Sequence, residues 1–172
     1  MKKSDFYYDL PERLIAQTPL ERRDSSKMLV MNRVTGEIKH QHFFDICEFL
    51  KEGDLLVMND SRVIPARIFG KKEDTGAEVE FLLLKQVENN SWETLVKPGK
   101  KAKIGTRFDF AGIMKGEITD IIDEGIRIIR FESDENIYSA LDKIGQMPLP
   151  PYITEKLEDK ERYQTVYSNE VG

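Results

Sequence analysis

"VMNDSRVIPARIFG", residues 57–70, separates two regions of the chain that differ in their sequence pattern. Before it, apolar residues at helical spacing alternate with short apolar runs, which indicates an α/β region. From Arg67 onwards, short strand-like segments follow one another, separated by Gly, Pro, Asn and Asp residues. Regular spacing of this kind predicts a small all-β barrel or sandwich. We therefore expect an α/β domain that is interrupted by an inserted β module.

The β module is expected to contain six strand-like segments: "ARIFGKK", "AEVEFLLLKQ", "SWETLVK", "TRFDF", "KGEITDII" and "GIRIIRFE". The next segment, "IYSALDKIG", has apolar residues at helical spacing, and Gly145 is a typical C-terminal stop for a helix. The α/β pattern resumes near residue 141. The predicted boundaries are 1–66 for the first part of the α/β domain, 67–144 for the inserted barrel, and 145–172 for the return into the α/β domain.

Four elements are predicted in the α/β region. Pro11 suits the first turn of a helix, and Pro19 ends it. Residues 27–43, "KMLVMNRVTGEIKHQHF", predict a hairpin with a Thr-Gly turn. Residues 43–54 predict a helix. Residues 54–58, "DLLVM", predict a short strand that is buried on both faces.

Composition narrows the class of protein. Of the 172 residues, 40% are hydrophobic and 33% charged, which is typical of a globular protein. The net charge of −5 argues against a generally basic surface for nucleic acid, although not against a local basic patch. A single cysteine excludes an intrachain disulfide framework and fits a reducing compartment. With no long apolar segment and no signal peptide, we expect a cytoplasmic protein without a membrane partner.

The quoted stretch also carries a candidate anion site. Arg62 and Arg67 lie five residues apart, so an unbroken strand would send them to opposite faces, but a kink at Pro65 could bring them together. Guanidinium groups match carboxylates and phosphates. The alternative is a pair of structural or solvent-facing arginines at a domain junction. Asp60 is a candidate general base or hydroxyl ligand, or else a residue that caps a turn.

Further polar segments have two interpretations each. Arg23 and Asp24 repeat the charged pattern before a strand, or form a solvated turn. Tyr152, in the rigid "PLPPYI", lines a pocket or belongs to a linker. Residues 162–164 are suited to stacking and hydrogen bonding, or to ordinary packing. His40 and His42 share one face of a strand but have no nearby ligand cluster, so we predict no metal site.

"KPGKKAK" places several lysines in a turn between two β segments. Residues 91–110 hold five basic and two acidic side chains, a balance of +3. A basic loop on a β module suits a nucleic-acid backbone, whereas a charged hairpin tip that improves solubility is the alternative. The four residues concerned are Lys97, Lys100, Lys101 and Lys103.

Six blocks in order and spacing resemble the S-adenosylmethionine:tRNA ribosyltransferase-isomerase family: "LPERLIAQTPLERRDSSKMLV", "TGEIKHQHFFDI", "GDLLVMNDSRVIPARIFG", "WETLVKPGKK", "IGQMPLPPYI" and "RYQTVYS". The resemblance covers nearly the whole chain. Ser61 replaces a usual threonine and keeps the hydroxyl; Lys27 and the pair Gln146-Met147 are further departures. Family members continue into a C-terminal half beyond "RYQTVYS", so the chain is expected to be part of a longer protein.

The resemblance implies an enzyme of queuosine biosynthesis. Such enzymes transfer the ribosyl part of S-adenosylmethionine to an aminomethyl-deazaguanine base in the tRNA anticodon and form epoxyqueuosine, with no metal. S-adenosylmethionine is then a consumed cosubstrate, and the implied fold is a barrel-like α/β domain interrupted by a small β-barrel. The full-length enzyme is expected to be a monomer. The 172-residue chain alone is expected to be inactive and to self-associate, with the β module as its better ordered part.

Each candidate residue is given a hypothetical role in this chemistry, which is our own assignment. Asp60 and Arg62 are assigned to catalysis, with Asp60 as base or ribose ligand and Arg62 as a ligand of carboxylate or phosphate. The four lysines are assigned to tRNA phosphates. The residues assigned to substrate binding are Ser61, Arg67, Arg23, Asp24, Tyr152, Arg162, Tyr163 and Gln164. A different class of function stays open, a non-catalytic RNA-binding β module on an α/β scaffold, which would have no use for S-adenosylmethionine.

Overall fold

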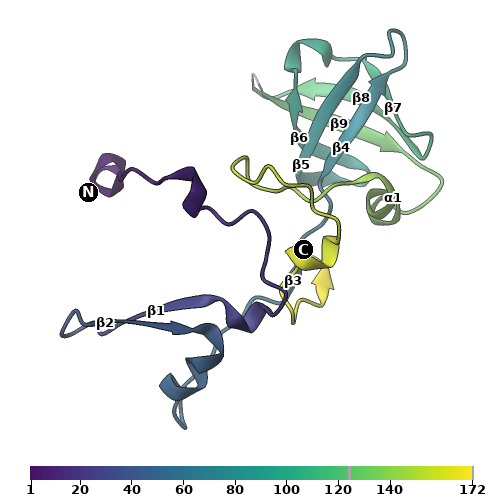
Figure 1. Cartoon of the computed structure of the whole chain (residues 1–172). Coiled ribbons are helices and arrows are strands. Elements are labelled where there is room, and N and C mark those ends of the chain that lie inside the picture. Colours follow the sequence, from purple (N-terminus) through teal and green to yellow (C-terminus); the bar gives the residue numbers. More distant parts are fainter. Residues whose placement is uncertain (124, 172) are drawn as a thin grey trace. The chain divides into compact units, whose positions relative to one another are not determined.

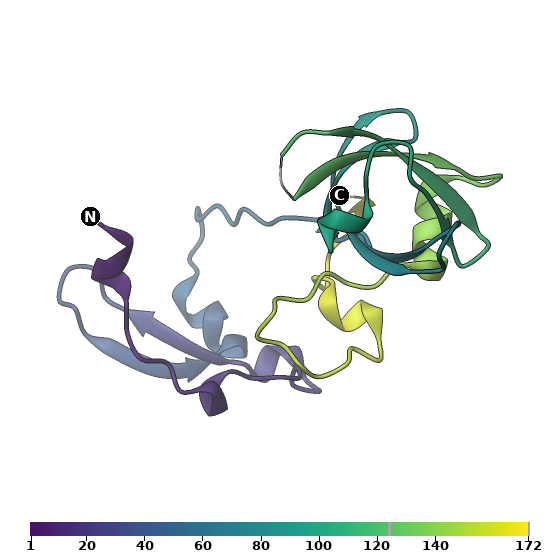
Figure 2. The same cartoon turned by 90° about the horizontal axis from the view of Figure 1, so that it is seen from above.

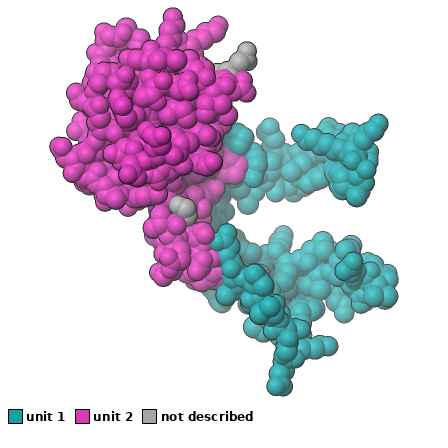
Figure 3. Space-filling model, turned by 180° about the vertical axis from the view of Figure 1, so that it is seen from behind, with its two compact units in different colours: residues 1–59, 151–158 teal, residues 60–150, 159–172 magenta. Residues whose placement is uncertain are grey.

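The structure is a computed structural model that describes residues 1–123 and 125–171. The chain divides into two compact units, coloured separately in Figure 3. Unit 1 comprises residues 1–59 and 151–158, and unit 2 comprises residues 60–150 and 159–172. Among the described residues, every helix is too short or too polar to cross a lipid bilayer.

Unit 2 is built on a closed antiparallel β-barrel, whose strands curl into a ring in Figure 2. The strands pair in the order β4-β5-β6-β9-β8-β7. This confirms the predicted barrel and excludes the sandwich for the described residues. The bounds are β4 Arg67–Lys72, β5 Glu78–Glu88, β6 Ser91–Lys97, β7 Arg107–Phe110, β8 Met114–Ile121 and β9 Ile126–Glu132. Each overlaps one of the six predicted segments, and the ends differ by at most two residues.

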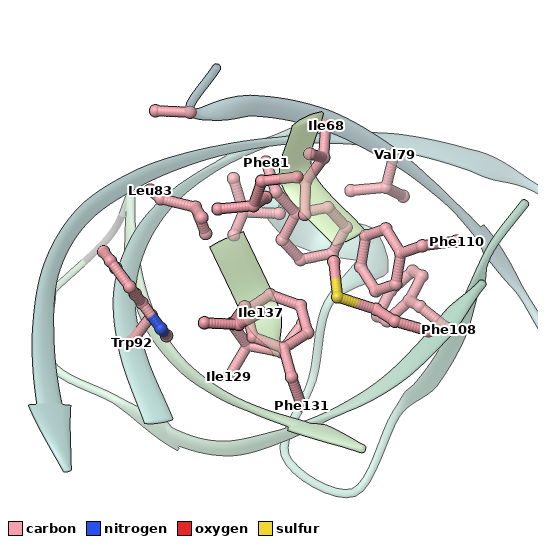
Figure 4. Packing of buried hydrophobic residues seen from close by; sticks show 14 of the residues in the cluster. Ile68, Val79, Phe81, Leu83, Trp92, Phe108, Phe110, Ile129, Phe131 and Ile137 are labelled. Carbon is pink, nitrogen blue, oxygen red and sulfur yellow. The ribbon is translucent and has the colours of Figure 1, made fainter. Parts of the chain in front are cut away.

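Side chains fill the barrel because alternate residues of each strand point inward. Phe81, Phe108 and Phe110 meet there with their rings close together (Figure 4), and all three are fully buried. The Phe81 ring lies 4.9 Å from Phe108 and 5.3 Å from Phe110, both edge to face. Gly70 allows this packing, because a Cβ at that position would lie 2.7 Å from the Phe110 ring.

Helix α1, Ile137–Ile144, packs against one end of the barrel (Figure 1). Its Asn136 cap accepts a hydrogen bond from the Tyr138 amide at 2.8 Å. Ile137, Ala140 and Leu141 are buried and join the barrel core. The helix ends at Gly145, whose amide donates to the Leu141 carbonyl. This confirms the predicted helix and its stop.

Gly145 is a sensitive position. A Cβ there would lie 2.1 Å from the Pro65 carbonyl oxygen and 2.6 Å from the Leu141 carbonyl oxygen, and both are backbone atoms that cannot rotate away. We expect Gly145→Ala to lower the free energy of unfolding of unit 2 by about 1–3 kcal/mol, measured by urea denaturation. Lys143→Ala is the control, because it removes only an exposed ion pair with Glu135 and should cost under about 1 kcal/mol. Equal stabilities of the two variants would contradict the tight contact.

Unit 1 contains the predicted hairpin. Strand β1, Lys27–Met31, pairs antiparallel with β2, Ile38–His42. The turn includes Gly36 at a φ of 73°, which glycine adopts without strain. The other elements of this unit are 3₁₀ helices: η1 Lys3–Phe6, η2 Glu12–Leu14, η3 Arg23–Ser25 and η4 Phe43–Phe49.

Three predictions for unit 1 are corrected. The helix after Pro11 is only the short η2, and the helix over 43–54 is the 3₁₀ helix η4, which ends before Leu50. The strand over 54–58 is not formed: these residues belong to no helix or strand, and Leu55 is 87% exposed. A strand needs a neighbour to accept and donate its backbone hydrogen bonds, and the two strands of the hairpin pair with each other.

Candidate functional site

The segment that follows Asn59 is joined to the end of the described chain. Strand β3, Ser61–Arg62, pairs in parallel with β10, Glu170–Val171. The Asp60 carbonyl oxygen accepts from the Asn169 amide at 2.7 Å and from the Glu170 amide at 3.2 Å. The backbone of the candidate catalytic residues is therefore held in place, while the side chains of Asp60 and Ser61 are exposed.

Gln164 forms two hydrogen bonds with the backbone of Val63, the residue after Arg62. Its side-chain amide accepts from the Val63 amide and donates to the Val63 carbonyl, both at 2.8 Å. Gln164 is only 4% exposed. It follows η6, Lys160–Tyr163, which Asp159 caps. Of the predicted cluster at 162–164, Gln164 is thus brought next to Arg62, while Arg162 and Tyr163 are half-buried in η6.

The two arginines of the predicted anion site have different partners. Arg62 forms an ion pair with Glu161, and its Nη1 donates to the Ser168 carbonyl at 3.5 Å. Arg67 lies on β4 and forms an ion pair with Glu80 at 3.0 Å, although the Nε–H is not aligned as a hydrogen bond. Binding of an external anion at either arginine therefore has to compete with a carboxylate of the chain.

A cavity of about 160 Å³ lies beside Arg62 within unit 2. Arg62, Glu161 and Gln164 contribute polar atoms to its wall, and Lys160 donates to the Asp142 carbonyl nearby at 2.9 Å. The remaining wall is apolar apart from Tyr138: Val63, Ile64, Pro65, Leu141, Met147 and Val171. A pocket whose wall combines apolar side chains with four charged residues suits a small ligand with an apolar part and a charged group.

Asp142, Lys160 and Glu161 were missed by sequence reasoning. They are separated along the chain from Arg62 by 80 to 99 residues, and only the fold brings them to one cavity. Their residue types carry no motif. The charged composition of "EDKERYQ" was visible, but nothing in the sequence indicated which of its side chains face Arg62.

Arg23, Asp24 and Tyr152 belong to unit 1. Asp24 forms an exposed ion pair with Arg22 at 3.0 Å, beside Arg23 in η3. The backbone around Tyr152 is held by Gln17, which donates to the Tyr152 carbonyl at 3.0 Å and accepts from the Thr154 amide at 2.8 Å. The Tyr152 side chain is 56% exposed.

His40 and His42 both lie on β2, two residues apart as predicted. The His42 ring stacks on Phe44 at 5.1 Å. Across residues 1–123 and 125–171, no three His, Cys, Asp or Glu side chains gather as a metal-binding group.

The basic loop, residues 97–103, connects β6 to β7 and includes η5, Gly99–Lys101. Its four lysines are exposed, and none of them forms an ion pair with a described residue. Several other cations of the barrel do form ion pairs. Arg107, for example, forms ion pairs with Glu132 at 2.9 Å, Glu117 at 3.3 Å and Glu73 at 3.5 Å.

This pairing has an electrostatic consequence. The hydrogen bond to Glu132 is the main cause that raises the pKa of Arg107 above its usual value, and the surrounding carboxylates add to it. The positive charge of Arg107 is thus compensated within the barrel. The four lysines of the basic loop keep charges that are available to an external anion.

Comparison with known proteins identifies the family. Residues 3–172 match the family model described as "Queuosine biosynthesis protein". Over its whole length the chain is 56% identical to the S-adenosylmethionine:tRNA ribosyltransferase-isomerase of Acetivibrio thermocellus and 55% identical to that of Clostridioides difficile. The chain belongs to this family. Both alignments span 51% of the relative, so the chain covers about half the length of the curated relatives that it matches.

A solved structure gives a further likeness. The crystal structure of S-adenosylmethionine tRNA ribosyltransferase from Thermotoga maritima is 42% identical and covers 74% of this chain and 44% of the other. Its TM-score is 0.37. Membership of the ribosyltransferase-isomerase family therefore rests on the sequence match.

Proposed function

We propose that the chain contributes to the transfer and isomerisation of the ribosyl group of S-adenosylmethionine. The acceptor is the aminomethyl-deazaguanine base in the anticodon of tRNA, and the product is epoxyqueuosine. S-adenosylmethionine is consumed as the ribosyl donor, with adenine and methionine released, and no metal takes part. Membership of the ribosyltransferase-isomerase family over residues 3–172 is the observation that supports this proposal.

The proposed reaction takes place in the cytoplasm, where tRNA is the substrate. The domain division 1–66, 67–144 and 145–172 remains our proposal for the full-length protein, a monomer in which the first and last segments belong to one barrel-like α/β domain. Many apolar side chains of unit 1 are exposed in this chain. Exposed apolar surface of this kind is typically covered by other protein surface, which supports the proposal.

For the chemistry, Asp60 is the proposed base or ribose ligand. Its carboxylate is exposed while its carbonyl is fixed by β10, so the side chain is oriented by a held backbone. Arg62 is proposed to bind the carboxylate of the methionine part or a phosphate, next to the apolar cavity. Ser61, Arg67, Arg162, Tyr163 and Gln164 in unit 2, and Arg23, Asp24 and Tyr152 in unit 1, are the proposed substrate contacts.

Activity of the full-length enzyme tests these roles. We expect Asp60→Ala and Arg62→Ala to lower kcat/KM by about 100- to 1,000-fold, because each removes a charged contact from the transition state. Epoxyqueuosine in the tRNA would be measured by mass spectrometry of nucleosides. Glu161→Gln is the control for Arg62, because it keeps a hydrogen-bond acceptor and removes only the competing charge. Near-normal turnover in both alanine variants would reject the assignment.

A non-catalytic RNA-binding module is the second candidate function. The observation in its favour is a closed barrel that carries four exposed lysines without ion pairs to the described residues. Titration of the 172-residue chain and the full-length protein with S-adenosylmethionine separates the candidates. An RNA module binds RNA alone, whereas the enzyme binds both.

The basic loop gives a prediction common to both candidates. Replacing all four of its lysines by glutamine should weaken binding to a tRNA anticodon stem-loop and lower the slope of log K against log salt by up to about four counterions. The control replaces Lys72, Lys115 and Lys143, each of which already has a carboxylate partner. A salt slope that stays the same in the loop variant would show that these lysines serve solubility.

A further inference from the structure

A buried arginine binds the backbone of the basic loop. Arg127 lies on β9 and is 7% exposed. Its Nε donates to the Ala102 carbonyl at 3.0 Å, and its Nη2 donates to the Gly99 carbonyl at 3.4 Å. On the other side, Nη1 donates to the carbonyls of Asp123 at 2.7 Å and Ile126 at 3.1 Å. One guanidinium group therefore joins the loop to the carbonyls of Asp123 and Ile126.

Few hydrogen bonds of its own hold the loop. Its backbone contacts include Lys101 N to Pro98 O at 3.2 Å and Ala102 N to Gly99 O at 3.1 Å, which make up the single 3₁₀ turn η5. A turn this short is not stable alone. The bonds from Arg127 fall on both residues that bracket the lysine pair 100–101, so they fix the loop where it carries its charge.

The base of this attachment is rigid. Arg127 stands in a β9 segment that pairs with β6 at Thr94 and with β8 at Ile121. Thr94 is fully buried and donates to the Arg127 carbonyl at 3.3 Å. Ala102, between Lys101 and Lys103, is 1% exposed and packs into the barrel core. The loop is thus anchored by a buried methyl group and a buried guanidinium, with exposed lysines on either side.

Burying a guanidinium is costly unless its donors are satisfied, so a residue that merely fills the barrel wall would be apolar. A charged loop that is already ordered binds a polyanion more tightly, because it loses less conformational entropy on binding. We propose that Arg127 is a positioning residue, which holds the basic loop in the conformation that meets RNA phosphates. This rests on the RNA contact proposed above.

The test uses the 172-residue chain with Arg127→Met and Arg127→Lys. Lysine keeps the positive charge, but its ammonium group cannot donate to the Gly99 and Ala102 carbonyls with the fixed planar geometry of a guanidinium group. We expect hydrogen exchange of the Lys101 and Ala102 amides to become at least about tenfold faster in both variants. Affinity for the anticodon stem-loop at constant salt should fall about three- to tenfold, with the salt slope kept within about one counterion because the four lysines remain.

Arg130→Met is the matched control. Arg130 is on the same strand, half-exposed, and meets Glu117 at 3.8 Å rather than the loop. It removes the same charge and should change neither loop exchange nor affinity. Each variant is shown to be folded if it keeps the Trp92 fluorescence of the native barrel. If Arg127→Met does not fold, the loop exchange and RNA affinity of Arg127→Lys alone test the proposal.

Each result has a defined meaning. Unchanged exchange of the loop amides in the folded variants overturns the proposal, whether or not RNA binds. A faster loop with unchanged affinity also overturns it, provided that the four-lysine variant has lost binding. If the four-lysine variant binds as well as the original chain, the RNA contact itself is rejected and the positioning role falls with it.

Discussion

Replacing Phe81 by alanine is expected to lower the free energy of unfolding of the barrel by about 3–5 kcal/mol. Phe81 is fully buried on β5 and contacts both Phe108 and Phe110 edge to face. Alanine would leave a cavity between these two rings, and it would also remove the aromatic pair contacts. Because a small domain has only about 5–15 kcal/mol of stability, this loss would be a large fraction of the total.

Trp92 provides the measurement. It is the single tryptophan of the chain, it lies on β6, and it is 4% exposed, so its fluorescence in a urea titration reports on the barrel. Phe69→Ala is the matched control, since Phe69 lies on the neighbouring strand β4 but is 37% exposed. We expect the control to cost under about 1 kcal/mol. Similar losses in both variants would show that the three rings do not form the centre of the core.

The barrel was predictable because its strands carry their own pattern. In "GIRIIRFE", Ile129 and Phe131 are buried, whereas Arg130 and Glu132 between and after them are exposed. This alternation involves only neighbouring residues, so it can be recognised in the sequence without knowledge of the fold. Gly145 was predictable as a helix stop for the same reason. The regular spacing of the strands left a barrel and a sandwich open, and the resemblance to the family implied the closed barrel that the structure shows.

Residues whose structure depends on distant partners were not predictable. The strand expected over 54–58 has an apolar sequence, but the described part of the chain supplies no strand to pair with it. Arg127 shares the alternating register of the buried Ile129 and Phe131, but the loop carbonyls that its side chain meets belong to residues 25 and 28 positions away. The pair of Arg62 with Glu161 joins positions 99 residues apart. Sequence spacing gives no information on any of these contacts.

The 172-residue chain is expected to self-associate through unit 1. Several of its large apolar side chains are more than half exposed, including Leu55 at 87% and Val57 at 83%. Hydrophobic surface of this extent favours association, and residues 55–58, which belong to no strand, can also pair through their backbone with a second copy. We expect a concentration-dependent mass in sedimentation experiments.

Changing both Leu55 and Val57 to lysine should weaken this association by on the order of a hundredfold. Burying one such side chain contributes about 1.5–3 kcal/mol, and a factor of ten corresponds to about 1.4 kcal/mol, so losing even part of two contacts suffices. The control changes Leu84 and Leu95 to lysine, which adds the same charge at barrel positions that are 45% and 44% exposed. A chain that stays monomeric at every concentration contradicts the prediction. So does an equal effect of the control, because net charge rather than the apolar surface of unit 1 would then govern association.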